Sequence, residues 1–404
     1  FVESQGDKTK DPVVIWLNGG PGCSSLLGFF QEIGPFVLGD IGTDFTENQY
    51  TWNKNASLLF LESPPGVGFS ENNDGVINYT DENTANDNYA GLIQFLTAFS
   101  DYKTNELCIT GESYGGMYIP WFANKVHDMN QLSTTTLKVN FKGIMVGNGV
   151  MDMNMVNRNK ALYKFLYERR LVDDDTAAIL IDLCDQDINS PSCQWAQNKV
   201  GNFLNVLNPY DIYGYCYPPT LSSQKKSKFH FTRFFLSGNA QGKLELQSVK
   251  GFLSSDSDDN PKFSSPCVGT QSVEDYLNLK TGKTYPNQDA FHIRTKQVWQ
   301  DCSEVVGNNY HPSGNGSIWI YEKLSKANYK ILIYSGDTDS VVSYVETMGY
   351  IAKMNLKVQK EWRPWLISGY QVGGYVTNYE GLNFTTVRGA GHMVPQWRRE
   401  SAYK

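Results

Sequence analysis

Short apolar runs recur along the chain, and longer stretches with helical spacing separate several of them. Six of these runs have the length and apolar character of buried strands; they are residues 12–18, 57–63, 107–111, 141–149, 330–336 and 382–391. A helical stretch is predicted over 83–102. Strands that alternate with helices indicate parallel βαβ units, so the pattern predicts an α/β fold with a mostly parallel central sheet and helices on both faces.

The alternation breaks between about residues 150 and 320, where most of the cysteines and the longest polar stretches lie. We interpret 151–320 as a helical cap inserted between two parts of the core, 1–150 and 321–404. Within the cap, 221–265 contains "SSQKKSK" and "SSDSDDN". This composition predicts an exposed loop that is open to proteolytic nicking.

Composition narrows the class of protein. The 404 residues are 40% hydrophobic and 13% aromatic, as expected for a globular chain with a large core. The formal net charge of −7 argues against a nucleic-acid partner, which would need a basic face. No apolar run approaches the roughly 20 residues of a membrane-spanning helix. The first residue is Phe, so the lack of a signal peptide says nothing about secretion.

The seven cysteines favour disulfides with one spare thiol, because no C-x-x-C or H-E-x-x-H pattern indicates a metal site. We therefore expect no metal and no cofactor. Four sequons for N-glycosylation point the same way as the cysteines, toward an oxidising compartment of the secretory route. The sequons are at Asn55, Asn78, Asn315 and Asn383.

A candidate nucleophile stands where the predicted strand 107–111 turns into a helix. Ser113 is flanked by glycines two residues before and two residues after it, in "GESYG". This is the G-x-S-x-G pattern of a nucleophile elbow, which lifts a serine hydroxyl to the top of an α/β sheet. By itself the pattern is weak, because serines in Gly-rich turns are common.

The rest of the chain supplies an acid and a base in the expected order of nucleophile, acid and histidine. The strand 330–336 is followed by Asp337 and Asp339, and either could be the acid. Of the five histidines, only His392 follows both. A lone histidine in a Gly-rich loop is more often structural. The order of Ser113, the aspartates and His392 instead favours a catalytic role for this histidine.

An oxyanion hole is predicted in "WLNGGPGCSS", residues 16–25, directly after the first strand. Three glycines and a proline leave backbone N–H groups pointing outward, as such a site requires. A plain turn or a phosphate loop are the alternatives. The phosphate loop fails because the only "GKT", at 282–284, has Leu277 where the first glycine should be.

Taken together, the long motifs resemble the serine carboxypeptidase family of α/β-hydrolases, most closely its plant-type carboxypeptidase II branch. The resemblance covers nearly the whole chain and rests on "WLNGGPGCSS", "LESPPGVGFS", "GESYGGMYIP", "GNGVMD", "YSGDTDSVV", "GYQVGGY" and "VRGAGHMVP". It implies the catalytic residues Ser113, Asp339 and His392, since the family's acid is the second Asp of G-D-x-D. It also implies that the backbone N–H groups of Gly20 and Tyr114 form the oxyanion hole.

The same resemblance implies a group that binds the C-terminal carboxylate of the substrate, namely Asn18, Gly19, Glu32 and Glu112. A negative Glu112 beside the nucleophile would repel that carboxylate. The contradiction disappears if the two glutamates share a proton, which raises one pKa and provides a hydrogen-bond donor. We therefore expect substrate binding to be strongest at acidic pH, as in a lysosome or vacuole, although an extracellular location also fits.

The predicted function is a serine carboxypeptidase that acts on peptide or protein C-termini through an acyl-enzyme. Met393 replaces a glutamate that basic-preferring plant enzymes carry next to the histidine, so an apolar P1 preference is expected. One alternative is an acyltransferase with the same triad, which would not need the carboxylate-binding group. Others are a protective partner of lysosomal hydrolases and a generic esterase or lipase.

Disulfides are implied by the resemblance alone, as Cys23–Cys302, Cys184–Cys193 and Cys216–Cys267. The remaining Cys108 is expected to be a buried, inert thiol. Family members carry further N-terminal strands and a closing C-terminal helix, so we expect this sequence to be clipped at both ends. Some relatives are homodimers, but the sequence carries no interface signal.

Overall fold

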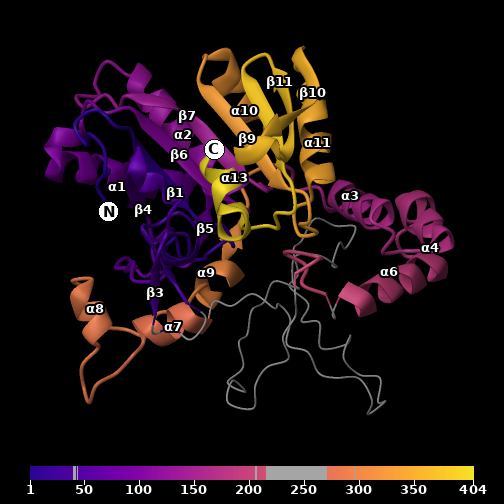
Figure 1. Cartoon of the computed structure of the whole chain (residues 1–404), viewed down its shortest axis with the longest axis horizontal. Helices are drawn as coiled ribbons and strands as arrows, with labels where there is room; N and C mark the ends of the chain where they lie inside the picture. Colours follow the sequence, from indigo (N-terminus) through magenta and orange to yellow (C-terminus); the bar gives the residue numbers. More distant parts are fainter. Residues whose placement is uncertain (40–41, 43, 205–206, 215–270, 295) are drawn as a thin grey trace.

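The computed structural model describes residues 1–39, 42, 44–204, 207–214, 271–294 and 296–404. In these residues an eight-stranded sheet has the order β10-β11-β12-β9-β7-β6-β1-β4 (Figure 1). Its strands are β1 (Val13–Leu17), β4 (Ser57–Phe60), β6 (Leu107–Glu112), β7 (Phe141–Gly147), β9 (Lys330–Gly336), β10 (Val358–Leu366), β11 (Val372–Tyr379) and β12 (Leu382–Val387). All six predicted strands are present, and they pair in parallel from β12 to β4.

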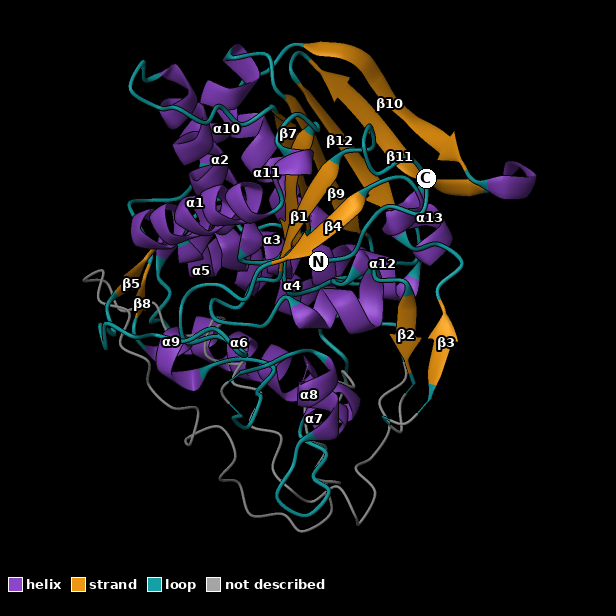
Figure 2. Ribbon diagram, turned by 90° about the vertical axis from the view of Figure 1, so that its left-hand side faces the viewer, coloured by secondary structure: helices purple, strands orange, loops and turns teal. Residues whose placement is uncertain are grey.

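Two antiparallel strands that were not predicted, β10 and β11, extend the sheet at one edge (Figure 2). Short strands form two further pairs, β2 (Phe36–Leu38) with β3 (Phe45–Glu47) and β5 (Tyr79–Thr80) with β8 (Tyr310–His311). The predicted mostly parallel central sheet is confirmed, and its antiparallel part is limited to this edge among the described strands.

Helices cover both faces of the main sheet. On one face, α1 (Asp81–Ala98), α2 (Gly115–Gln131), α10 (Ile318–Lys326) and α11 (Tyr344–Lys353) enclose the largest core. The other face is covered by a π-helical turn, η1 (Gly28–Glu32), and by α12 (Val394–Trp397) and α13 (Arg399–Tyr403). Alternate residues of β1 show the division, because Val13 and Ile15 enter the first core while Val14 and Trp16 enter a second one.

The helices between 151 and 320 fall into two groups (Figure 1). One contains α3 (Met155–Glu168), α4 (Asp174–Ala178), α5 (Cys184–Gln186) and α6 (Pro191–Leu204), with its own apolar core. A buried ion pair between Arg158 and Glu346, 2.7 Å long, links α3 to α11. The other group contains α7 (Gln271–Leu277), α8 (Pro286–Ala290) and α9 (Glu304–Asn308), and α7 packs against η1 and β2. The boundaries 1–150, 151–320 and 321–404 stay a prediction, and the expected loop 221–265 lies outside the described residues.

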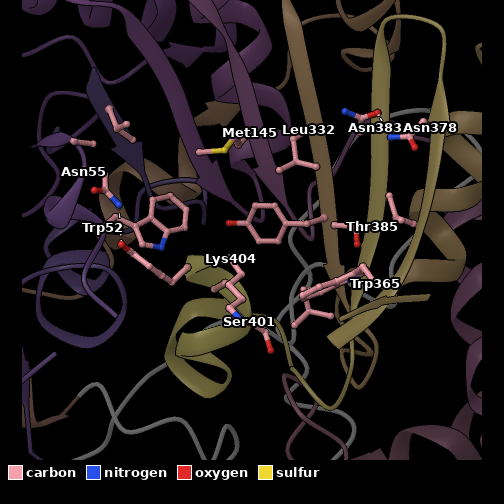
Figure 3. A pocket seen from close by; sticks show the side chains of 17 residues that line it. Trp52, Asn55, Met145, Leu332, Trp365, Asn378, Asn383, Thr385, Ser401 and Lys404 are labelled. Atoms are coloured by element: carbon pink, nitrogen blue, oxygen red, sulfur yellow. Dashed lines mark hydrogen bonds between the residues drawn. The ribbon is translucent and has the colours of Figure 1, made fainter. Parts of the chain in front are cut away.

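The sheet face that carries α13 also contains a largely apolar pocket of about 520 Å³. Figure 3 shows Trp52 on one side of the pocket and Trp365 on the other, with Met145 and Leu332 of the sheet between them. Lys404 also lines it.

Within the described part of the chain, no helix combines the length and apolar character that crossing a bilayer requires.

Candidate active site

Ser113 occupies a strained turn between β6 and α2. Its φ of 62° lies in the left-handed region, which is uncommon for residues other than glycine. Hydrogen bonds hold this conformation: Ser113 N donates to Gly147 O at 3.0 Å, and Ser113 O accepts from the N–H groups of Gly116 and Val150, each at 2.9 Å. The turn also needs a glycine at 111, because a Cβ there would lie 1.9 Å from Leu17 O. The local structure is therefore the strand–turn–helix that the sequence predicted.

The acid and the histidine meet at the ends of two adjacent strands. β9 and β12 are parallel neighbours, so the loops that follow them leave the sheet at the same end. His392 Nδ1 lies 2.7 Å from Asp339 Oδ2, and both side chains are buried. With the proton on Nδ1, this contact leaves Nε2 as the basic nitrogen. Nε2 is buried and has no hydrogen-bond partner among the described residues, and His392 lines the same small cavity as Ser113.

Asp337, the other acid that the residues alone allowed, has different hydrogen-bond partners. Its Oδ1 accepts a hydrogen bond of 2.6 Å from Gly389 N, and its carbonyl accepts one from Arg169. The structure therefore places Asp339 on His392 and gives Asp337 a role in holding the loop after β12.

The loop after β1 lies directly against the turn at Ser113. A Cβ on Gly19 would be 2.4 Å from Tyr114 N and 2.7 Å from Ser113 Cβ, so only glycine allows this approach. Gly20 has a φ of 115° and lines the cavity with Ser113. The loop is tethered by the Cys23–Cys302 disulfide and by a hydrogen bond of 2.8 Å from Ser303 N to Gly22 O. The backbone of the loop after β1 and that of the turn at Ser113 are thus in close contact beside the cavity.

Two buried glutamates and an asparagine form a hydrogen-bonded group next to Ser113. Asn18 Nδ2 donates to Glu112 Oε1 at 3.0 Å and to Glu32 Oε1 at 3.3 Å. The amide is oriented by its own oxygen, which accepts from Trp16 Nε1 at 2.8 Å and from Gly28 N at 3.1 Å. The remaining oxygens of both glutamates, Oε2, are buried without a partner among the described residues.

Burial determines the protonation of this pair. It raises the pKa of Glu32 to about 7, while hydrogen bonds from Asn18 and Glu112 partly offset the rise. Burial also raises the pKa of Glu112 well above its ordinary value, and the adjacent Glu32 carboxyl adds to that rise. Since two close buried carboxyls resist joint ionisation, the pair retains a proton in mildly acidic solution.

The cavity beside Ser113 has a volume of about 50 Å³ and is bordered by residues that the sequence did and did not predict. Met393 is half-buried and packs near Val150 and Val341. Tyr210 was missed: its carbonyl accepts a hydrogen bond of 2.7 Å from His392 N, and its ring meets the imidazole edge-on at 5.2 Å. No motif marks this tyrosine, so the sequence carried no signal for it. Other lining residues that were not predicted are Leu27, Gln31 and Gln396.

The structure contains the disulfides Cys23–Cys302 and Cys184–Cys193, whereas Cys216 and Cys267 lie outside the described residues. Cys108 is a free, half-buried thiol whose pKa is raised to about 11 by burial, which disfavours the reactive thiolate. The described residues contain no cluster of three or more side chains suited to a metal ion. The asparagines of all four sequons are exposed: Asn55, Asn78, Asn315 and Asn383.

A family model and individual relatives both match this chain and indicate the same family. The chain matches the family model described as "Serine carboxypeptidase" over residues 1–404. It is 36% identical over 407 residues to serine carboxypeptidase-like 22 of Arabidopsis thaliana, covering 99% of this chain and 82% of that protein. It is 34% identical over 421 residues to the lysosomal protective protein of Mus musculus, covering 100% and 85%.

A solved structure with the same fold is that of Kex1Δp, a prohormone-processing carboxypeptidase from Saccharomyces cerevisiae. The TM-score is 0.72 at 21% sequence identity, covering 100% of this chain and 84% of that one. With the strand order above, this match confirms the predicted α/β-hydrolase fold.

Proposed function

The chain belongs to the serine carboxypeptidase family, and from that premise we propose that it removes C-terminal residues from peptides through an acyl-enzyme. The observation that carries the proposal is the position of the Asn18–Glu32–Glu112 group. It lines the same cavity as Ser113 and His392, so a peptide bound by its terminal carboxylate presents its last peptide bond to the serine.

In the proposed reaction, His392 Nε2 takes the Ser113 proton as the hydroxyl attacks the carbonyl carbon. Asp339 keeps the imidazole in the correct tautomer and stabilises its protonated form. The N–H groups of Gly20 and Tyr114 stabilise the oxyanion. The C–N bond then breaks, and the leaving amine receives the proton from His392. Water, activated by the same histidine, releases the shortened peptide from the ester.

Recognition of the terminal carboxylate accounts for the exopeptidase character. A protonated carboxyl of the Glu32–Glu112 pair donates a hydrogen bond to the substrate carboxylate, together with the Asn18 amide and Gly19 N–H. A comparison of a blocked dipeptide with its C-terminal amide tests this. We expect kcat/KM to be about 10- to 100-fold higher for the acid, because a hydrogen bond to a charged group contributes about 1.5–3 kcal/mol. Equal values would indicate a general esterase or amidase instead.

We further propose that the protein works in an acidic compartment of the secretory route, such as a lysosome or vacuole, or outside the cell. Two disulfides, four exposed sequons and a glutamate pair that holds its proton in mild acid support this location. A relative at 34% identity is named a lysosomal protective protein.

Replacing Glu112 with glutamine should flatten the pH dependence of substrate binding. The pKa of Glu32 is raised to about 7 and that of Glu112 well above its ordinary value. The wild-type pair is therefore fully protonated at about pH 5, and Glu32 ionises as the pH rises through about 7, so the wild-type KM should rise over that range. In Glu112→Gln the amide donates at every pH. Activity should therefore be lost mainly at acidic pH, and KM should vary less between pH 5 and 8 than it does in the wild type, with Glu32 as the remaining group of the pair that titrates.

The matched control is Glu106→Gln, because Glu106 is an exposed carboxylate just before β6. It should keep the wild-type profile of KM against pH. If Glu112→Gln also keeps that profile, Glu112 is not the donor whose protonation sets the pH dependence.

Met393 is proposed to border the P1 site, and Met393→Glu should shift specificity toward basic residues. The wild-type thioether is apolar and adaptable, so Phe or Leu at P1 should exceed Arg by roughly 10- to 100-fold in kcat/KM at acidic pH. A partly buried glutamate would pair with Lys or Arg and reduce or reverse that ratio. Met393→Gln is the control for charge, because glutamine has nearly the shape of glutamate but no charge. It should lower kcat/KM for Phe without raising kcat/KM for Arg. A clear preference of the wild-type enzyme for Arg would contradict the prediction.

A further inference from the structure

Asn148, the first residue after β7, uses its whole side-chain amide to hold the loop that carries Asp339. One N–H of Nδ2 donates to Asp339 Oδ2 at 2.8 Å, and the other donates to Val342 O at 3.2 Å. Oδ1 accepts from Gly336 N at 2.9 Å. The side chain is fully buried. Because its two N–H groups and its oxygen all have partners, the orientation of the amide is fixed.

The oxygen that Asn148 contacts is the one on which the histidine depends. Asp339 Oδ2 also faces His392 Nδ1, whereas Oδ1 accepts from Val341 N at 2.7 Å. Val342 N completes the set with a bond of 3.1 Å to Oδ2. In the part of the chain that the structure describes, Asn148 and His392 are the two side chains that hydrogen-bond to Asp339.

Hydrogen-bond donors without a charge are important for stabilising the Asp339 carboxylate, because further carboxyls lie near it. The ionisable groups that face Asp339 among the described residues include Glu112 of β6, Glu346 of α11 and His392. Buried carboxylates are stabilised by hydrogen bonds when no permanent cation is beside them. Glu346 has its own partner in Arg158, so the amide of Asn148 is the side-chain dipole directed at Asp339.

We propose that Asn148 is a positioning residue for the triad: its amide fixes the Asp339 carboxylate so that Oδ2 stays on His392 Nδ1. This inference rests on the proposed function, in which that contact sets the tautomer of the catalytic histidine. Without the amide, only two backbone N–H groups and the imidazole itself hold the carboxylate, and rotation about its last bond can withdraw Oδ2 from the imidazole.

A simpler explanation of Asn148 has to be separated from this one. Its φ is 40°, in the left-handed region where asparagine, aspartate and glycine are favoured over other residues. The asparagine could serve the backbone alone. Glycine meets that backbone requirement equally well but has no amide, so Asn148→Gly distinguishes the two roles.

The experiment measures the rate at which a fluorophosphonate labels Ser113, since labelling depends on the triad but needs no substrate carboxylate. We expect Asn148→Gly to be labelled about 100-fold more slowly, the size of effect that a misplacement of about 1 Å can produce. For a blocked dipeptide, kcat should fall similarly while KM stays within about three-fold. Labelling within ten-fold of wild type would overturn the inference.

Asn148→Asp provides a second test. Aspartate is nearly isosteric with asparagine and is also favoured in the left-handed backbone conformation at this position. At neutral pH the new carboxylate repels Asp339 and offers no donor, so labelling should be slow. Toward pH 5 the carboxyl is protonated and donates the hydrogen bond again, and the deficit relative to wild type should shrink. A deficit independent of pH would overturn the role of the amide as a donor, even if Asn148→Gly does not fold.

Asn105→Asp is the matched control, because Asn105 is also buried and donates two hydrogen bonds, to Lys8 O and Asp11 O, away from the triad. It should label at the wild-type rate. Wild-type protein that is labelled but does not cleave the dipeptide would refute the proposed function and leave Asn148 testable. Wild-type protein that is not labelled would overturn both.

Discussion

Ser113→Ala is expected to abolish turnover while the protein stays folded. Loss of a triad nucleophile typically lowers kcat by 10⁴-fold or more. Alanine fits the turn, whose conformation depends on backbone hydrogen bonds to Gly147, Gly116 and Val150 and not on the hydroxyl. The measurement is kcat for a blocked dipeptide, with the melting temperature as the check on folding.

The matched control for this variant is Ser335→Ala, which removes a buried hydroxyl in β9 that bonds to Thr347 outside the cavity. It should retain activity. If Ser113→Ala keeps more than about one-thousandth of the wild-type rate, the serine is not the nucleophile.

Asp339→Asn should produce the second largest loss, about 10⁴-fold in kcat. An amide cannot stabilise the protonated imidazole, and its NH₂ group favours the wrong histidine tautomer. The volume of the side chain is unchanged, but the new NH₂ group faces N–H donors that the carboxylate accepted from. The melting temperature should therefore fall as well, and kcat should be measured well below it.

Asp337→Asn is the informative comparison, since Asp337 lies two residues away on the same loop. Its Oδ1 accepts only a backbone N–H, a role that an asparagine oxygen can fill. We expect it to retain activity within about ten-fold of wild type. A loss equal to that of Asp339→Asn would contradict the geometry of the site.

The strands predicted from the sequence are those that the sheet buries. β1, β6 and β7 are short apolar runs, and their periodicity is sufficient to identify them. β10 was missed because most of its residues are exposed and it includes Pro364, so neither an apolar run nor an alternation marks it. It exists because β11 pairs with it, which is a tertiary cause. The predicted helix 83–102 forms as Asp81–Ala98, begun by a cap in which Thr80 accepts from Asn83 N.

The site residues also divide into those that local sequence identifies and those that depend on tertiary contacts. Local motifs and their order along the chain were enough to nominate Ser113, His392 and the glycines after β1. The turns require glycines beside the serine, and only one histidine follows both aspartates. The choice between Asp337 and Asp339 could not be made from spacing, since it depends on which carboxylate faces a histidine about fifty residues later. Asn148 lay within a quoted motif, yet its contact with Asp339 spans 191 positions, and no local pattern encodes such a distance.

The Cys23–Cys302 disulfide joins residues 279 positions apart, and this makes the molecule tolerant of a broken backbone. A single cut anywhere between the two cysteines, including in the segment 221–265, would leave two polypeptides that are still covalently linked. After a cut in 221–265, Ser113 would belong to one polypeptide and His392 to the other. The parallel pairing of β7 with β9 would hold them together across the cut. Such a two-chain form would migrate on a gel as one species until a reductant separates it into two.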